Sequence, residues 1–153
     1  MTQVSDDPSS LRYVAGVDQQ AGVLAWMERD SERKFWIVTS RRTRRWVLPK
    51  GGIDSGMEGH EAAAQEAFEE AGVTGDISPV SVGSYLIAKI RPPLIWTVEV
   101  VLYPMRVAQV HDDWQESGQR DRRLVSVDEA AELIVEPDIV ALLRREVPRL
   151  SVA

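Results

Sequence analysis

Short apolar runs, separated by charged or glycine-rich segments, dominate the first third of the chain. Residues 21–26 (AGVLAW) and 34–40 (KFWIVTS) are rich in apolar, β-branched and aromatic side chains, and the charged stretch MERDSER lies between them. This pattern predicts two strands joined by a turn. Residues 46–48 predict a third, short strand that ends at Pro49 and the glycine pair after it.

A stretch of different composition follows, over residues 59–71 (GHEAAAQEAFEEA). Strong helix formers fill it, and Gly72 follows, the residue most often found just past a helix end. The sequence therefore predicts a helix. At about 100° of rotation per residue, Glu66, Glu69 and Glu70 share one arc of roughly 100°. The face opposite these carboxylates is predicted to pack on the core through Ala64, Phe68 and Ala71.

The second half of the chain mixes strand and helix signals. Strands are predicted at residues 82–90 and 94–105, on either side of a turn with two prolines, and a brief apolar run follows at 124–127. Helical spacing predicts two C-terminal helices, at 128–134 and 138–147. This order predicts an α/β (α+β) sandwich. We expect one domain over residues 11–153, after a flexible tail at residues 1–10.

Composition and charge exclude several classes of function. The 153 residues include no cysteine and two histidines, which argues against a zinc site and a cysteine nucleophile. The net charge of -6 disfavours binding to nucleic acid or to anionic membranes. The first ten residues do not resemble a secretory signal, and no apolar run is long enough for a spanning helix. We therefore expect a cytoplasmic protein.

Three carboxylates on one side of a helix need a positive partner. Residues at i, i+3 and i+4 that carry like charges weaken a helix by a few tenths of a kcal/mol per pair. A hard divalent cation fits, because Mg²⁺ prefers carboxylate, carbonyl and water oxygens. Gly51 and Gly52 let the backbone turn sharply before the helix and bring carbonyls close to it. A solvated acidic face is the alternative, and this glycine pair favours the cation site.

Residues 51–73 (GGIDSGMEGHEAAAQEAFEEAGV) resemble the signature of the Nudix hydrolases, G-x5-E-x7-R-E-U-x-E-E-x-G-U, where U is a bulky aliphatic residue. Six signature positions are in register: Gly51, Glu66, Glu69, Glu70, Gly72 and Val73. Two positions depart, because Met57 replaces the first glutamate and Gln65 replaces the arginine. In the family, that arginine pairs with the glutamates of the signature.

The resemblance extends to SRRTRRWVLPKGG and to the later DDW, which are similar to the diphosphoinositol polyphosphate phosphohydrolase branch and its bacterial relatives. It implies an α/β/α sandwich with a mixed, curved sheet. It also implies hydrolysis of a phosphoanhydride in a small phosphorylated substrate: a nucleoside diphosphate linked to another moiety, a dinucleoside polyphosphate or a diphosphoinositol polyphosphate. A monomer and a homodimer both remain open.

The resemblance also implies roles for individual residues. Glu66 and Glu70 would bind Mg²⁺ or Mn²⁺ together with the backbone carbonyl of Lys50. Glu69 would orient or deprotonate the attacking water, and Glu116 is the reserve candidate for that base.

Substrate phosphate is predicted to contact arginines. Arg41 and Arg42 belong to the basic segment SRRTRRW, which directly precedes the signature, and the planar guanidinium binds phosphate at two points. The resemblance places Arg91 and Arg120 at further phosphate-contacting positions.

Two other functions compete with hydrolysis. Gln65 and Met57 are compatible with a catalytically weakened domain that binds a phosphorylated ligand as a sensor. An RNA-binding or decapping module would use the arginine segment, and the negative net charge disfavours it.

Overall fold

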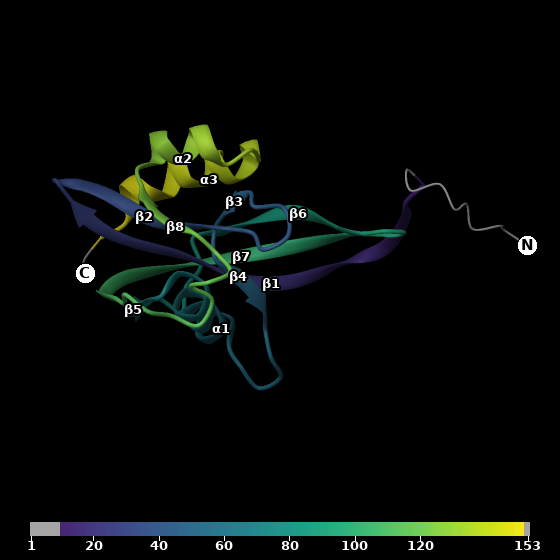
Figure 1. The fold of residues 1–153 in the computed structure, drawn as a ribbon, viewed down its shortest axis with the longest axis horizontal. Helices are drawn as coiled ribbons and strands as arrows, with labels where there is room; N and C mark the ends of the chain where they lie inside the picture. The colour runs from purple at the N-terminus through teal and green to yellow at the C-terminus, as the bar shows by residue number, and fades with distance from the viewer. Residues whose placement is uncertain (1–9, 152–153) are drawn as a thin grey trace, which may run out of the picture.

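A computed structural model describes residues 10–151 of the chain, so the predicted tail lies outside the described residues except for Ser10. Within that range, eight strands form one sheet (Figure 1). The strands are β1 (Arg12–Arg29), β2 (Glu32–Thr39), β3 (Trp46–Val47), β4 (Lys50–Gly52), β5 (Val73–Ile77), β6 (Gly83–Arg91), β7 (Leu94–Val110) and β8 (Arg122–Val125).

The sheet is mixed, as predicted. Its main order is β3-β2-β1-β7-β5, and β4, β6 and β8 pair with β1, β7 and β2 respectively. The long central strands β1 and β7 are parallel, and every other pair is antiparallel. The short strand β4 pairs with the middle of β1, which fixes the glycine-rich segment against the sheet.

Helices cover both faces of the sheet (Figure 1). On one face lies α1 (Gly59–Glu66), which continues as the π-helical turn η1 (Ala67–Ala71). On the other face lie α2 (Val127–Leu133), α3 (Pro137–Glu146) and the 3-10 turn η2 (Val147–Arg149). The predicted sandwich is therefore confirmed. No helix within residues 10–151 has the length and apolarity needed to cross a membrane.

The alternation of side chains along the central strands builds two cores. Along β1, Leu24 and Trp26 join the cluster under α2 and α3, whereas Val23 and Ala25 join the cluster under α1. The α1 cluster is built largely from small residues. Its buried alanines are Ala21, Ala25, Ala62, Ala63, Ala67 and Ala71. Because alanines meet alanines, the helix can approach the sheet closely.

The prediction of which helix face packs on the core was wrong in part. Ala71 is buried, but Ala64 is only partly buried and Phe68 is 42% exposed, with its ring edge-on to His111 at a centroid distance of 5.6 Å. The helix instead buries the side that carries Glu70, which is 5% exposed. The prediction placed the carboxylates opposite the core, whereas one of them lies within it.

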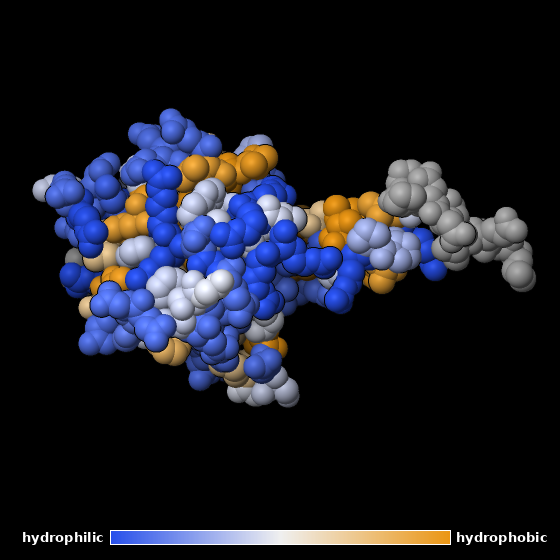
Figure 2. Space-filling view, viewed as in Figure 1, coloured by the Kyte–Doolittle hydropathy of each residue, from blue (hydrophilic) through white to orange (hydrophobic). Residues whose placement is uncertain are grey.

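The strands also differ from the predicted bounds. β1 and β7 extend well beyond residues 21–26 and 94–105, and β5 was not predicted. The first half of β1 mixes apolar and polar side chains that are almost all exposed, which hides the strand in the sequence, but its backbone pairs with β7. The first half of β1, the start of β7 and the paired strand β6 form an arm that projects from the body (Figure 1). Figure 2 shows apolar side chains along the arm. The exposed ones are Tyr13, Val14, Val17, Leu86, Ile90 and Leu94.

Candidate active site

Two carboxylates project from the helix towards the glycine-rich strand β4. Glu66 is the last residue of α1, and Glu70 lies one turn later in η1. The backbone N–H of Lys50 donates to Glu70 Oε1 at 3.3 Å. Gly51 lies so close to Glu66 that a methyl group in place of its hydrogen would overlap the Glu66 carboxylate. A side chain at position 51 would therefore displace Glu66.

Burial disfavours the ionised form of both carboxylates. It raises the pKa of Glu70 to about 8; Arg120 opposes this shift, and the neighbouring Glu66 adds to it. Burial also raises the pKa of Glu66. Since desolvation disfavours the ionised form, two adjacent acids of this kind share a proton unless a cation joins them. A cation at this position would stabilise both in the ionised form.

The turn that carries Glu70 is a π-turn, and π-turns occur often at functional sites. The helix ends at Gly72, whose left-handed φ of 66° confirms the predicted end. The end of a helix leaves backbone carbonyls without helical partners. Here the segment between β7 and β8 supplies donors: Trp114 Nε1 binds the Glu70 carbonyl at 3.0 Å, and Glu116 N binds the Glu69 carbonyl at 3.1 Å.

Arg122 completes this support. Its guanidinium donates to the Ala71 carbonyl at 2.9 Å and lies over the Trp114 ring, 3.9 Å from the centroid. Trp114 and Arg122 thus hold the turn, and sequence reasoning gave neither residue this function. The signal was present, because a tryptophan in a polar segment has an indole N–H that needs an acceptor.

Replacing Trp114 by phenylalanine is expected to lower the free energy of unfolding by about 1 kcal/mol, because the Glu70 carbonyl loses its donor. Equilibrium urea unfolding measures the change. Gln115→Ala, at an exposed neighbour in the same segment, is the control. A loss no larger than that of the control would show that the indole does not hold the turn.

The remaining signature positions have local partners. Gln65 Nε2 donates to Glu69 Oε1 at 2.8 Å, and Glu69 is partly exposed beside the carboxylate pair. Met57, which replaces the first glutamate of the signature, is partly buried against the alanine cluster. Met57 therefore packs, and Gln65 orients Glu69 without supplying charge.

Two further ionic side chains approach the pair from the segment before β8. Arg120 lies 3.4 Å from Glu70 Oε2 and 3.0 Å from Glu116 Oε1, with 10% of its side chain exposed. The Glu116 side chain is 12% exposed, and Arg41 lies 3.9 Å from it. The structure thus brings together Glu70, Glu116, Arg120 and Arg41.

Lys50 also lies close to Glu70. Burial, and then the neighbouring Lys89 ammonium, lower the pKa of Lys50 to about 8, although Glu70 acts in the opposite direction. The site therefore combines two adjacent carboxylates with the nearby Lys50 ammonium.

The four arginines of the basic loop have different environments. Arg44 donates to Asp121 at 2.7 Å, and Arg45 pairs with Glu136 at the start of α3. Arg41 donates to the Gln119 side chain at 3.3 Å. Arg42 is exposed, and among residues 10–151 its side chain makes no hydrogen bond or ion pair. Arg44 and Arg45 thus fix the loop, and Arg42 stays available.

Arg91 is the one predicted site residue that lies far from the carboxylates. It ends β6 opposite Leu94, at the tip of the arm, whereas Lys50 is level with Leu102 across β1. Eight residues of β7 separate these levels. Within residues 10–151, no hydrogen bond or ion pair joins Arg91 to Glu66 or Glu70.

The donor set near Glu66 and Glu70 suits a hard cation only with additional oxygens. Among residues 10–151, no three His, Cys, Asp or Glu side chains gather as metal ligands. Two carboxylates, completed by oxygens from backbone, water and phosphate, would match the way Mg²⁺ is usually held. Because Gly51 has no side chain, the Glu66 carboxylate fills the space beside it, and this packing keeps the carboxylate in place. The residues therefore fit a divalent ion that shares substrate oxygens.

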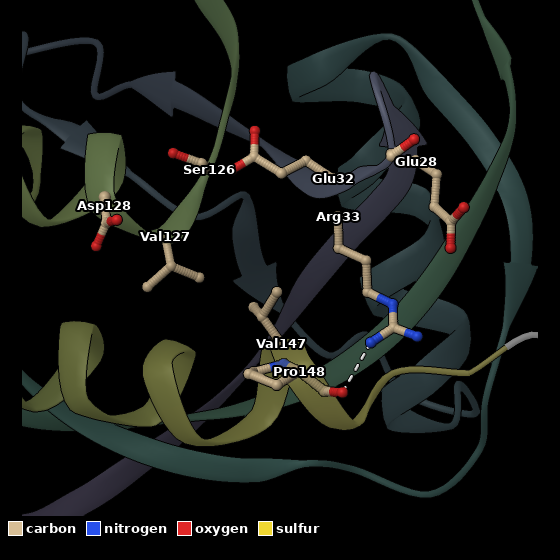
Figure 3. Close-up of a pocket in the computed structure, with 9 residues that line it drawn as sticks. Glu28, Glu32, Arg33, Ser126, Val127, Asp128, Val147 and Pro148 are labelled. Carbon is tan, nitrogen blue, oxygen red and sulfur yellow. Dashed lines mark hydrogen bonds between the residues drawn. The ribbon is translucent and has the colours of Figure 1, made fainter.

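A separate surface pocket of about 400 Å³ lies between the β1–β2 turn, the start of α2 and the end of α3 (Figure 3). Glu28, Glu32 and Asp128 line it, and Arg33 is turned to the Pro148 carbonyl at 2.7 Å. Its excess of carboxylates disfavours phosphate. It shares no residue with the carboxylate pair on α1 and η1.

Comparisons with known proteins agree with this geometry. The NUDIX domain family model matches residues 18–146. Nudix hydrolase 4 of Arabidopsis thaliana is 33% identical over 97 residues, which cover 63% of this chain and 45% of that protein. Diphosphoinositol polyphosphate phosphohydrolase 3-beta of Bos taurus is 26% identical over 121 residues, which cover 78% of this chain and 70% of that protein.

The fold has solved relatives as well. The crystal structure of the C. elegans Ap4A hydrolase matches with a TM-score of 0.64 and 20% identity, over 89% of this chain and 100% of that one. The chain spans about half the length of the plant relatives that it matches. Since the family model covers most of the sequence and the signature glutamates lie together at one site, the chain belongs to the NUDIX domain family.

Proposed function

We propose that the protein hydrolyses a phosphoanhydride bond in a small phosphorylated substrate with the help of Mg²⁺ or Mn²⁺. The observation that carries the proposal is the adjacent pair Glu66 and Glu70, which faces β4 beside Gly51, with Glu70 buried and Glu66 partly buried. Two substrate classes follow the names of similar proteins, diphosphoinositol polyphosphates and the dinucleoside polyphosphate Ap4A, and a nucleoside diphosphate linked to another moiety is the third. Such substrates fit a cytoplasmic protein.

Glu66, Glu70 and the Lys50 carbonyl would hold the metal. When bound, a divalent ion neutralises diphosphate charge and lowers the pKa of a coordinated water from 15.7 towards about 7. The Lys50 N–H holds the Glu70 carboxylate, and the space beside Gly51 accommodates the Glu66 carboxylate.

Glu69 would accept the proton of the attacking water. It is partly exposed, lies beside Glu66, and is oriented by Gln65 Nε2. Proton removal by a positioned carboxylate contributes typically about 10²–10⁴-fold in rate. Glu116 is the reserve base, although its carboxylate already pairs with Arg120 at 3.0 Å.

Positive side chains would hold the phosphates. Arg41 and Arg42 lie on the exposed loop next to β3 and would contact outer phosphates. Arg91 would contact only a ligand that reaches the tip of the arm.

Replacing Arg42 by glutamine is expected to raise KM about tenfold with little change in kcat, because one charge-assisted hydrogen bond to phosphate is lost. Steady-state kinetics on the best substrate measure both constants. Arg106→Gln, at an exposed position on β7, is the control. An unchanged KM for Arg42→Gln would remove this arginine from the substrate site.

A panel of diphosphates tests the proposal. Diadenosine polyphosphates, nucleoside diphosphate sugars and diphosphoinositol polyphosphates are each incubated with Mg²⁺, with Mn²⁺ and with EDTA, and released phosphorylated products are quantified. We expect turnover of at least one class with metal and none with EDTA. Equal rates with EDTA would exclude the metal, and no turnover of any class would exclude the hydrolase.

A sensor is the second candidate, and Gln65 favours it because the usual arginine of the signature is absent. A sensor would bind one of these ligands tightly without cleaving it, and Gln65→Arg would not create turnover. Calorimetry on the ligand that binds best, with product analysis of the same sample, separates the two functions.

A further inference from the structure

The signature of this chain lacks its arginine, yet one cation still contacts the signature carboxylates. Gln65 replaces the arginine and reaches only Glu69. Arg120, 50 residues further along from Glu70, instead places its guanidinium 3.4 Å from Glu70 Oε2. The positive charge near Glu70 therefore comes from a different segment of the chain.

Arg120 is held in place on three sides. Nε pairs with Glu116 Oε1 at 3.0 Å, Nη1 donates to the Thr39 carbonyl at 3.1 Å, and Nη2 faces Glu70. Its own segment is anchored as well, because Asp121 N donates to Thr39 Oγ1 at 2.9 Å, and Thr39 is 4% exposed. The end of β2 thus fixes the guanidinium in one orientation.

These contacts give Arg120 an environment different from that of the arginines that would bind substrate. The Arg120 side chain is 10% exposed, whereas that of Arg41 is 60% exposed. The carboxylates of Glu70 and Glu116 already face the Arg120 guanidinium. A phosphate would have to compete with both carboxylates for the same N–H groups. A guanidinium in this state acts on Glu70 rather than on the substrate.

We propose that Arg120 takes the place of the missing signature arginine and is the positioning residue that holds Glu70 ready to bind the metal. This inference rests on the proposed function, since it assigns Glu70 to a metal site. It differs from the resemblance, which places Arg120 on substrate phosphate. Outer partners of metal ligands typically change metal affinity or activity by about 10–100-fold when they are removed.

The test compares Arg120→Gln, Arg120→Lys and the double variant Gln65→Arg with Arg120→Gln. Mn²⁺ affinity is measured without substrate by electron paramagnetic resonance, and kcat and KM are measured separately. Arg120→Gln should weaken Mn²⁺ binding about tenfold and lower kcat, with KM nearly unchanged. Arg120→Lys should lose less, and the arginine at position 65 in the double variant should restore part of the affinity. Arg123→Gln, at an exposed arginine on β8, should match the wild type.

Other outcomes overturn the inference. A raised KM with unchanged kcat and Mn²⁺ affinity would place Arg120 on the substrate. Tighter Mn²⁺ binding by Arg120→Gln would mean that the guanidinium competes with the metal. If the wild type bound Mn²⁺ but cleaved no diphosphate, the proposed function would fail while the affinity series still decided the part played by Arg120.

Discussion

Replacing Glu70 by glutamine is expected to lower kcat/KM by at least about 100-fold, because removing an outer partner of a ligand already costs up to that factor. The amide keeps the size of the side chain but carries no charge, so the site loses one of its two adjacent carboxylates. Mn²⁺ binding should weaken in parallel. The measurements are steady-state kinetics on the best substrate and Mn²⁺ titration without substrate.

A matched control separates charge at the site from charge in general. Glu132→Gln removes a carboxylate from an exposed position on α2, on the opposite face of the sheet from Glu70, and should leave both measurements unchanged. Circular dichroism should show both variants folded. A folded Glu70→Gln protein with wild-type activity would falsify the assignment of Glu70 to the metal.

Replacing Gly51 by alanine should reduce kcat/KM by about 100-fold, because a displacement of about 1 Å in catalytic geometry can have that effect. The reason is steric, since the new methyl group would occupy the position of the Glu66 carboxylate. Gly51 does not have a positive φ, so alanine is compatible with the backbone there. The loss should therefore come from a displaced carboxylate in a folded protein.

The adjacent glycine is the matched control. A methyl group at Gly52 would meet no atom within 4 Å, so Gly52→Ala should behave like the wild type. Kinetics and thermal unfolding of the two variants form the comparison. If both alanines had equal effects on activity, the Gly51 contact with Glu66 would not explain the requirement for glycine.

Local patterns predicted much of the fold. The continuous apolar run of β2 and the helix formers of α1 gave elements close to those observed, because burial on a sheet and helix propensity both act locally. The first half of β1 escaped prediction for the opposite reason. Its side chains, apolar and polar alike, are exposed on the arm, and only the distant pairing with β7 makes it a strand.

The sequence likewise predicted some features of the site and missed others. Glu66, Glu70 and Gly51 could be placed together from spacing and resemblance alone, because they lie within one turn and one helix. The burial of Glu70 was not predictable, since the helix face was assigned with the carboxylates outward. The contacts of Trp114 and Arg120 depend on a segment that returns to the helix after β7, which spacing does not encode.

The most direct test of the central claim is a crystal structure with Mn²⁺ and methylenediphosphonate, a diphosphate analogue whose P–C–P bridge cannot be hydrolysed. The anomalous signal locates the manganese. We expect one strong peak between the Glu66 and Glu70 carboxylates, with a phosphonate oxygen in its coordination shell. Manganese bound elsewhere, with these two carboxylates bare, would contradict the account.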